Sequence, residues 1–422
     1  METLSQRDQK HLWHPLTQHK LHPEHLAITK AKGSLLFDEN GKEYIDGIAS
    51  WYTCMYGHCN PHITDKIKEQ LDSLDHVIFS GFTHNPAIEL SESLMEILPK
   101  NQQKIFFSDN GSTSVDIALK MALQYHFNRG EKRSKIIALE NAFHGDTFGA
   151  MSVSGLSVYN GPFEDFLLTI DRIPVPDEQN FQDAKQTFRA LINSGEVAAF
   201  IYEPLVQGAA AMKMYSPELL NELLEIAKDA NVLAIADEVM TGFGKTGRNF
   251  ASDWLSISPD IMCLSKSLTG GIAPMALTTC TKEVYDAFYS EELSKGFFHG
   301  HTYSANPLTC TAALASVELL KSEEIQEAIR GIERSHKVFE DKIARHPKVA
   351  STRSLGVIFA LDLNIEMDRY GSKRDFMFNF FMNEGVFLRP LGNTIYILAP
   401  FVTTVEQMEK IYSTIEKCLD KI

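Results

Sequence analysis

Two ionisable residues follow short apolar segments of the sequence. Residues 232–236 run directly into Asp237, and residues 260–265 run into Lys266. Because the carboxyl ends of parallel strands in an α/β sheet face the ligand crevice, we expect both side chains to reach one site. Burial at the end of an apolar strand lowers the pKa of a lysine amine and leaves it neutral and nucleophilic, so that it can form a Schiff base with an aldehyde. For either residue taken alone, a surface ion pair is the simpler interpretation.

Together, the acid and the amine predict a particular kind of chemistry. A carboxylate such as Asp237 can keep the ring nitrogen of a pyridine cofactor protonated, and the ring then withdraws electrons from the substrate. The pair therefore indicates a Schiff-base enzyme with Lys266 and Asp237 as its catalytic residues.

A phosphate site is predicted at residues 108–113, between a strand and a helix. Gly111 permits a close approach, and the backbone amides of Ser112 and Thr113 should be free at the helix N-terminus, which attracts anions. The alternative is an ordinary helix cap. Phe143, which follows the next strand, is a candidate for stacking on a planar ring, although an aromatic residue there also fits turn packing.

Two further motifs are interpreted as structural. Residues 242–247 match the pattern G-x-G-x-x-G, but no strand leads directly into them and no apolar helix follows, so we predict a tight loop with positive φ rather than a nucleotide site. The motif Cys54, His58, Cys59 and His62 has a spacing that suits zinc, but it lies at a turn with Gly57, Asn60 and Pro61. The histidines at positions 11, 14, 19, 22 and 25 show no sharp ligand pattern. We therefore predict structural histidines and no metal.

The elements that must position these residues are alternating strands and helices. Strands are predicted at residues 104–108, 134–139, 197–202, 232–236, 260–265 and 275–279. Apolar residues recur at helical spacing between them, from Val115 and from Leu219 onward. This alternation predicts an α/β domain with a largely parallel sheet at residues 60–316.

The two ends of the chain have a different pattern. Residues 33–48 predict a hairpin with its turn near Asn40-Gly41. After a long helical stretch ending near His346, strands are expected at residues 357–363, 386–389 and 394–398, and a helix from Thr404. We predict that residues 1–59 and 317–422 together form a smaller α+β domain.

Composition excludes several classes of protein. Of the 422 residues, 44% are hydrophobic and 23% are charged, which is typical of a globular protein and not of a disordered chain. Forty Lys and Arg against 55 Asp and Glu give a net charge of −15, which disfavours a nucleic-acid partner. Six scattered cysteines and a polar beginning of the chain favour the cytoplasm. No stretch approaches the roughly 18 apolar residues that a membrane span needs.

Several motifs, taken in order, resemble those of the class III aminotransferases, which are pyridoxal-phosphate enzymes of fold type I. The resemblance covers nearly the whole chain. Its motifs are Asp237-Glu238-Val239 with Gly242-Phe243-Gly244, Pro259-Asp260, Lys266 before Gly270-Gly271, Glu203-Pro204 with Gln207-Gly208, and Gly300-His301-Thr302 with Asn306-Pro307. The resemblance implies pyridoxal 5'-phosphate as the cofactor, small-molecule substrates and a homodimer.

The resemblance also implies roles for individual residues. Lys266 would carry the cofactor as a Schiff base, and Asp237 would pair with its ring nitrogen. The phosphate would be bound by Gly111 and Ser112, and Thr302 of the partner subunit would join them. The remaining implied residues are Phe143, which would stack on the ring, Trp51, Tyr52 and Gly300 on the substrate side, and Arg389, which would hold a substrate carboxylate.

A second set of motifs is similar to one branch of this family, which aminates 8-amino-7-oxononanoate in biotin synthesis. The set includes Trp13-His14-Pro15, Ser50-Trp51, residues 84–90, residues 144–152 and Arg389-Pro390. Ornithine and γ-aminobutyrate relatives typically carry a glutamate after the Gln-Gly motif, where this chain has Ala209-Ala210.

The amino donor stays open between two compounds. The resemblance implies adenosylmethionine, but the chain has Leu16 and Phe143 where tyrosine is common and Lys245 where arginine is common. Because the loss of hydroxyl groups from a pocket alters discrimination, lysine is an alternative donor.

Three more hypotheses compete with this function. The chain could be a class III aminotransferase for a long-chain or polyamine substrate, a related fold that has lost catalysis, or a zinc- or nucleotide-binding protein. Intact Lys266 and Asp237 argue against the loss of catalysis.

Overall fold

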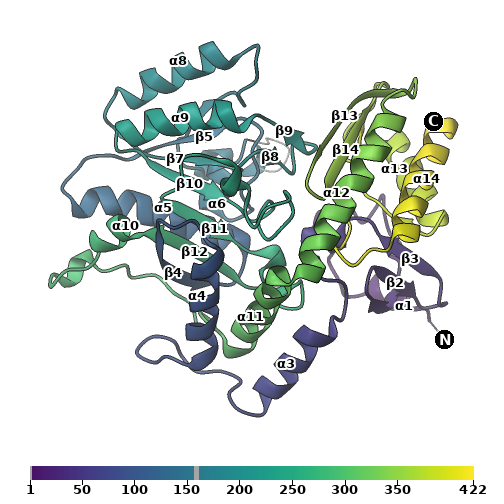
Figure 1. The fold of residues 1–422 in the computed structure, drawn as a ribbon, viewed down its shortest axis with the longest axis horizontal. Coiled ribbons are helices and arrows are strands. Elements are labelled where there is room, and N and C mark those ends of the chain that lie inside the picture. The colour runs from purple at the N-terminus through teal and green to yellow at the C-terminus, as the bar shows by residue number, and fades with distance from the viewer. Residues whose placement is uncertain (1, 156–160) are drawn as a thin grey trace.

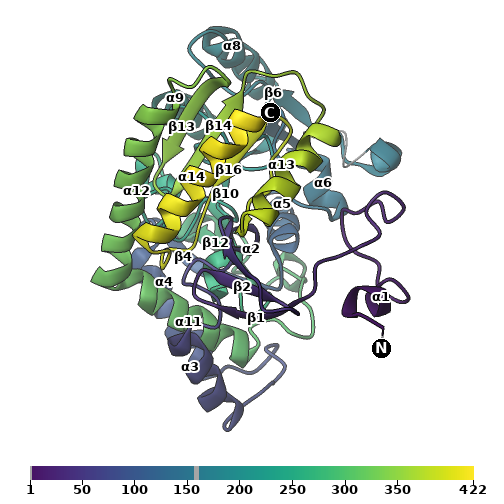
Figure 2. The same cartoon turned by 90° about the vertical axis from the view of Figure 1, so that its right-hand side faces the viewer.

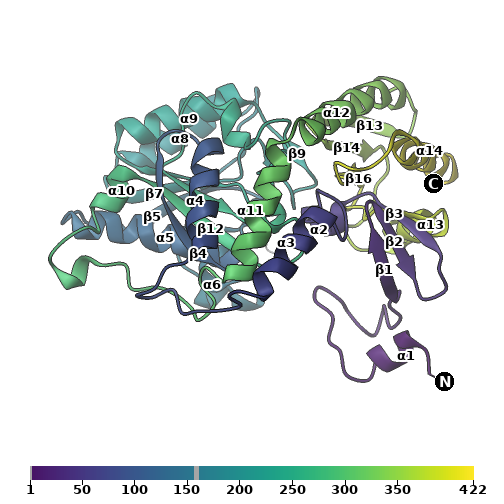
Figure 3. The ribbon, with the colours of Figure 1, turned by 60° about the horizontal axis from the view of Figure 1, so that its bottom comes forward.

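The computed structural model describes residues 2–155 and 161–422. A large α/β part and a smaller part lie side by side, and both ends of the chain belong to the smaller one (Figures 1 and 3). In the described part of the chain, no helix has the length and apolar character needed to cross a bilayer.

A seven-stranded sheet forms the centre of the large part, in the order β4-β12-β11-β10-β7-β5-β6. Its strands are β4 (Gln102–Ser108), β5 (Lys135–Leu139), β6 (Asp171–Ile173), β7 (Val197–Tyr202), β10 (Leu233–Asp237), β11 (Ile261–Leu264) and β12 (Ala276–Thr281). Strand β12 runs antiparallel to both of its neighbours, and the other neighbouring strands pair in parallel. The predicted α/β fold with a mainly parallel sheet is confirmed. The short β6 is missing from the prediction because three residues carry too little periodicity.

Helices cover both faces of this sheet, which explains why its central strands β7, β10 and β11 are buried along their whole length and almost entirely apolar. Along β10, Leu233 and Ile235 pack into one apolar cluster with α5. Ala234 and Ala236 pack into the other cluster, with α4, α8, α9 and α11. The helices of the large part are α3 (Pro61–Leu71), α4 (Asn85–Ile97), α5 (Gly111–Asn128), α6 (Phe148–Val153), α8 (Phe181–Ile192), α9 (Pro217–Asp229), α10 (Lys282–Asp286) and α11 (Pro307–Lys321).

The smaller part joins segments from both ends of the chain. Strand β3 pairs in parallel with β15, although nearly the whole chain separates them. The predicted hairpin is present as β2 and β3, and the predicted C-terminal strands are β14, β15 and β16. The elements of this part are β1 (Ile28–Lys32), β2 (Leu35–Asp38), β3 (Glu43–Asp46), β13 (Val349–Leu355), β14 (Ile358–Leu363), β15 (Val386–Phe387), β16 (Thr394–Ile397), α12 (Glu323–Ile343), α13 (Ser372–Asn383) and α14 (Val405–Lys421). The residue limits of the two domains stay a prediction.

Three elements of the smaller part are absent from the prediction. Strands β1 and β13 are rich in polar residues, and α13 lacks a regular apolar stripe, so none of them shows a clear period. The long helical stretch is two helices, because Ser322 adopts an extended conformation and caps α12. The N-terminal segment, α1 (Leu4–Asp8) followed by turns to residue 27, lies at the periphery of the molecule (Figure 2).

Candidate active site

A cavity of about 590 Å³ opens where several strands of the large sheet end. Its lining follows β4, β5, β7, β10 and β11, and segments of the N-terminal part complete it. Seven of the residues singled out in the sequence line it, namely Trp51, Tyr52, Gly111, Ser112, Phe143, Asp237 and Lys266. The structure therefore gathers the acid, the amine and the phosphate loop around one space.

Asp237 and Lys266 reach this cavity from neighbouring strands. Asp237 is the last residue of β10, is buried, and lies level with Cys263 of the parallel β11. Lys266 follows β11 with a left-handed backbone, φ 49°. Its Nζ lies 5.1 Å from the centre of the Tyr52 ring. Burial lowers the pKa of the Lys266 amine, and the charges of Asp237 and Glu203 oppose that shift only in part. The amine is therefore biased toward its neutral, proton-accepting form.

His144 fixes the carboxylate of Asp237. The His144 Nδ1 lies 2.7 Å from Asp237 Oδ2, and the backbone amide of Val239 donates to Oδ1 at 3.1 Å. The other ring nitrogen of His144 is buried and has no hydrogen-bond partner among the residues that the structure describes. The sequence shows His144 only as part of a motif, because its contact with Asp237 joins residues that are far apart in the chain.

Glu203 is a second residue of the site that the sequence shows only as part of a motif. The amide of Phe143 donates to one of its carboxylate oxygens at 2.9 Å, and the amide of Gly208 donates to the other at 3.0 Å. Burial raises the pKa of Glu203 to about 7; Asp237 adds to the shift and His144 opposes it. Glu203 thus ties the loop that presents Phe143 to the turn after Gln207.

The phosphate loop is shaped by two glycines. A Cβ on Gly145 would stand 2.1 Å from Ser112 Oγ, and a Cβ on Gly111 would stand 2.8 Å from a methyl carbon of Val239. The Oγ of Ser112 accepts a hydrogen bond from the amide of Asp146. The expectation of a free Thr113 amide is wrong, because this group donates to the side chain of the capping residue Asn110 at 3.0 Å. The amides of Gly111 and Ser112 remain the candidates for binding an anion.

A strained turn carries Trp51 and Tyr52 into the cavity. Four consecutive residues, Ala49 to Tyr52 (α2, Ala49–Tyr52), have positive φ between 46° and 72°. Such a conformation costs roughly 1–2 kcal/mol per residue, so other contacts must stabilise it. Asp46 accepts hydrogen bonds from Ser50 and from His58, both at 2.8 Å, and the Tyr52 hydroxyl donates to Tyr396 at 3.0 Å.

The ion pair under this turn predicts a pH dependence of stability. Burial alone would lower the pKa of His58, but its hydrogen bonds with Asp46 and Cys54 raise it to about 10. The folded pKa lies above the unfolded value, so the stabilisation is complete below about pH 6.5 and is lost as the pH rises toward 10. We expect His58→Gln to lower the urea midpoint strongly at pH 6 and much less at pH 10. An equal difference at both values would show that His58 is not charged in the folded protein.

The other predicted residues of the site, two for the substrate and Thr302 for the cofactor of the partner subunit, lie outside this cavity. Of the described residues that line it, none is Gly300, Thr302 or Arg389. The guanidinium of Arg389 lies 4.7 Å from the centre of the ring of Trp51, which does line the cavity. Gly300 and Thr302 are exposed on a loop of the large part. The cavity is lined in addition by Leu16 and by Arg369, which donates to the carbonyl of Ala209 at 2.9 Å.

Side chains in the two motifs interpreted as structural are held by hydrogen bonds within the protein. In residues 242–247, Phe243, Gly244 and Gly247 have positive φ, which confirms the tight loop. Lys245 of this loop is buried and donates to the carbonyl of Gly242 at 2.7 Å. In the second motif, His58 bonds to Asp46, and His62 lies 2.7 Å from Glu318.

Comparison with known proteins extends over the whole chain. Residues 16–419 match the family model of the class III aminotransferases. The chain is 43% identical to the adenosylmethionine-8-amino-7-oxononanoate aminotransferase of Synechococcus elongatus, over 98% of this chain and 99% of that protein. The crystal structure of the enzyme with the same name from Methanocaldococcus jannaschii superposes with a TM-score of 0.94 at 33% identity, covering 99% of this chain and 98% of that one. The ω-transaminase of Pseudomonas jessenii in complex with PMP has a TM-score of 0.94 at 25% identity, covering 100% and 98%.

Proposed function

The chain belongs to the class III aminotransferases, and from this premise we propose that it transfers an amino group to 8-amino-7-oxononanoate and so makes 7,8-diaminononanoate for biotin synthesis. The observation that carries the chemistry is the meeting of Lys266 and Asp237 in one cavity. The acceptor is supported by the names of the relatives and by Ala209-Ala210, which replace the glutamate of ω-amino-acid enzymes.

The cavity fits pyridoxal 5'-phosphate, the cofactor of this family. A Cβ at Gly111 would collide with Val239 and a Cβ at Gly145 would collide with Ser112, so glycine allows close packing here, where Gly111 and Ser112 line the cavity at the start of α5. Asp237 presents a fixed carboxylate, and Phe143 presents an aromatic side chain to the same space. Gly111 and Ser112 would hold the phosphate, Asp237 the ring nitrogen, Phe143 the ring face and Lys266 the aldehyde carbon.

When bound, the cofactor withdraws electrons from the substrate carbon that carries the amino group and stores that group between donor and acceptor. The chain supplies the proton transfers. The neutral Nζ of Lys266 takes a proton from the α-carbon of the donor and returns it later, and its lowered pKa suits this role. The negative charge of Asp237, held in position by His144, would keep a proton on the ring nitrogen of the bound cofactor.

The donor is adenosylmethionine in this proposal, as in the names of the relatives. A half-reaction screen tests it. Purified enzyme is mixed with adenosylmethionine, lysine or ornithine, and the change in cofactor absorbance that accompanies amino transfer is followed. We expect only adenosylmethionine to produce the change. If lysine produces the change and adenosylmethionine does not, lysine is the donor, and the assignment of the acceptor is unaffected. A test with 8-amino-7-oxononanoate as the only acceptor examines the second half separately.

Arg389 provides the positive charge for the substrate carboxylate in this proposal. We expect Arg389→Ala to raise KM for 8-amino-7-oxononanoate about 30-fold or more, with a smaller change in kcat, because a charge-assisted hydrogen bond to an anion is lost. Steady-state kinetics with the acceptor and with its methyl ester measure this effect. The ester has no carboxylate, so its KM should differ little between the parent enzyme and Arg389→Ala. Equal losses for acid and ester would contradict the role.

A homodimer with shared active sites is the last element of the proposal. Two neighbouring loops of the large part expose four large apolar side chains, Ile78, Phe82, Phe298 and Tyr303. The loops touch, since the rings of His76 and Tyr303 lie 5.2 Å apart. A cluster of this kind is typical of a protein interface. Thr302, on one of these loops, would then reach the phosphate of the partner's site.

We expect the enzyme to work in the cytoplasm, where its six free cysteines stay reduced.

Mixing two inactive variants tests whether Thr302 acts across the interface. Lys266→Ala and Thr302→Val are refolded or co-expressed together, so that mixed dimers form. If Thr302 acts in trans, each mixed dimer contains one intact site, and activity rises well above that of either variant. If Thr302 acts within its own chain, no intact site exists and activity does not rise. Light scattering establishes the dimer separately.

A further inference from the structure

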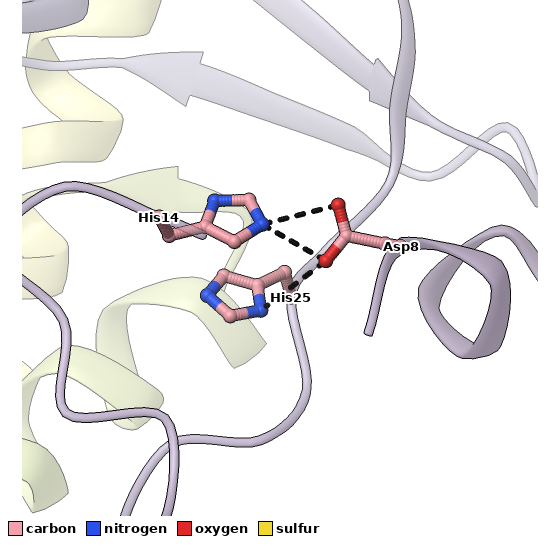
Figure 4. Close-up of side chains that lie close together, drawn as sticks. All are labelled: Asp8, His14 and His25. Atoms are coloured by element: carbon pink, nitrogen blue, oxygen red, sulfur yellow. Dashed lines mark hydrogen bonds and ion pairs between the residues drawn. The ribbon is translucent and has the colours of Figure 1, made fainter. Parts of the chain in front are cut away.

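Three potential metal ligands gather in the N-terminal segment, apart from the cavity of the active site (Figure 4). Asp8 is the last residue of α1, and His14 and His25 lie in the turns that follow. The His14 Nε2 lies 3.0 and 2.8 Å from the two oxygens of Asp8, and the His25 Nδ1 lies 3.8 Å from the nearer oxygen. The ligand atoms of all three residues lie within 4.8 Å of one another.

The Nδ1 atom of His25 is the observation that points to a ligand between these three side chains. This nitrogen is buried and has no hydrogen-bond partner among the residues that the structure describes. At 3.8 Å, Asp8 is too far to accept a hydrogen bond from it. A buried nitrogen without a partner is costly, so proteins usually give it a partner or a metal ion. The Nδ1 of His25 points to the same carboxylate that His14 already contacts and forms a long ion pair with it (Figure 4).

The spacing suits a small divalent ion. Zinc binds imidazole nitrogen and carboxylate oxygen at about 2.0–2.2 Å, so neighbouring ligand atoms of a tetrahedral site stand roughly 3.2–3.6 Å apart. The separations of 2.8 and 3.8 Å between Asp8 and the two histidines lie on either side of this range. The rings of His14 and His25, which are stacked with centroids 3.7 Å apart, would have to turn so that a nitrogen of each points at the ion, and water would be a further ligand.

Contacts within the N-terminal segment hold the histidines of the cluster close together. The rings of His14 and His25 stack with their centroids 3.7 Å apart and their planes 13° apart. The backbone amide of His14 donates to His19 Nε2 at 3.0 Å, which fixes the chain next to the cluster.

We propose that Asp8, His14 and His25 form a binding site for one divalent transition-metal ion, with zinc as the best match to this donor set. The ion would link α1 to the turns that follow it. Leu16, two residues after His14, lines the cavity of the active site, so the ion would also steady one wall of that cavity. The proposal does not depend on the substrate.

The test uses tag-free holoenzyme, freed of metal by a chelator, in a Cys59→Ser background that removes the exposed thiol. Calorimetric titration with zinc should show one ion per chain, and bound zinc should raise the melting temperature. His25→Ala and Asp8→Asn should each weaken zinc binding at least 10-fold. His22→Ala should not, because His22 is an exposed histidine of the same segment outside the cluster.

Two results would overturn the proposal. The first is the absence of stoichiometric zinc binding to the holoenzyme at micromolar concentration. The second is equal zinc affinity of the parent, His25→Ala and Asp8→Asn, which would mean that the three residues form only an ion pair. Circular dichroism and cofactor content of each variant show that it is folded, and the more conservative His25→Gln repeats the test with a side chain of similar size.

Discussion

Lys266→Ala lowers kcat about 10⁴-fold, because the variant lacks both the amine that holds the cofactor and the base that moves the substrate proton. Single-turnover absorbance measurements give the rate of each half-reaction. Borohydride reduction followed by peptide mass mapping locates the covalent attachment of the cofactor. We expect it at Lys266 in the parent and nowhere in the variant.

A second buried lysine provides the control for this experiment. Lys245 is also enclosed by the protein, and burial lowers its pKa, but its Nζ donates to the carbonyl of Gly242 and it does not belong to the described lining of the cavity. Lys245→Arg should therefore keep the attachment at Lys266. Small primary amines added to Lys266→Ala should restore part of the proton transfer. Attachment and turnover that persist in Lys266→Ala would refute the assignment.

Asp237→Asn lowers kcat about 10²- to 10³-fold at saturating pyridoxal phosphate, with the size of the side chain preserved. The neutral amide cannot keep the ring nitrogen protonated, so the ring becomes a poorer acceptor of electrons. Half-reaction rates at several cofactor concentrations separate this loss of rate from a loss of cofactor affinity. A variant that retains more than about a tenth of the parent rate would contradict the role of the charge.

His144→Asn is the matched variant for this prediction. It leaves the charge of Asp237 in place but removes the imidazole that lies 2.7 Å from its carboxylate. We expect a smaller fall in rate than for Asp237→Asn, together with a change in the absorbance of the bound cofactor, because His144 is a positioning residue. An equal fall in both variants would mean that the orientation of Asp237 matters as much as its charge.

The sequence by itself determined the elements that carry the chemistry. Each apolar strand is a local pattern, and a residue directly after it must stand at the end of the sheet, which is why Asp237 and Lys266 can be paired from the sequence. The position of Gly111 at the start of a helix could be predicted for the same reason, since a strand, a short loop and a helix follow one another there. The motifs indicate the family, which the comparisons confirm.

Tertiary structure decided which distant groups meet. His144 contacts Asp237 across 93 positions of sequence, and β3 pairs with β15 from the other end of the chain. No periodic pattern encodes such contacts, because they depend on how whole elements pack. The same holds for the cluster of Asp8, His14 and His25, whose spacing in sequence resembles no metal motif. The Thr113 amide is different, because its partner Asn110 is only three residues away and the helix cap was the alternative that the sequence left open. Short stretches of residues determine the local backbone conformation. The positions of distant side chains relative to one another are determined only when the elements pack into a common core.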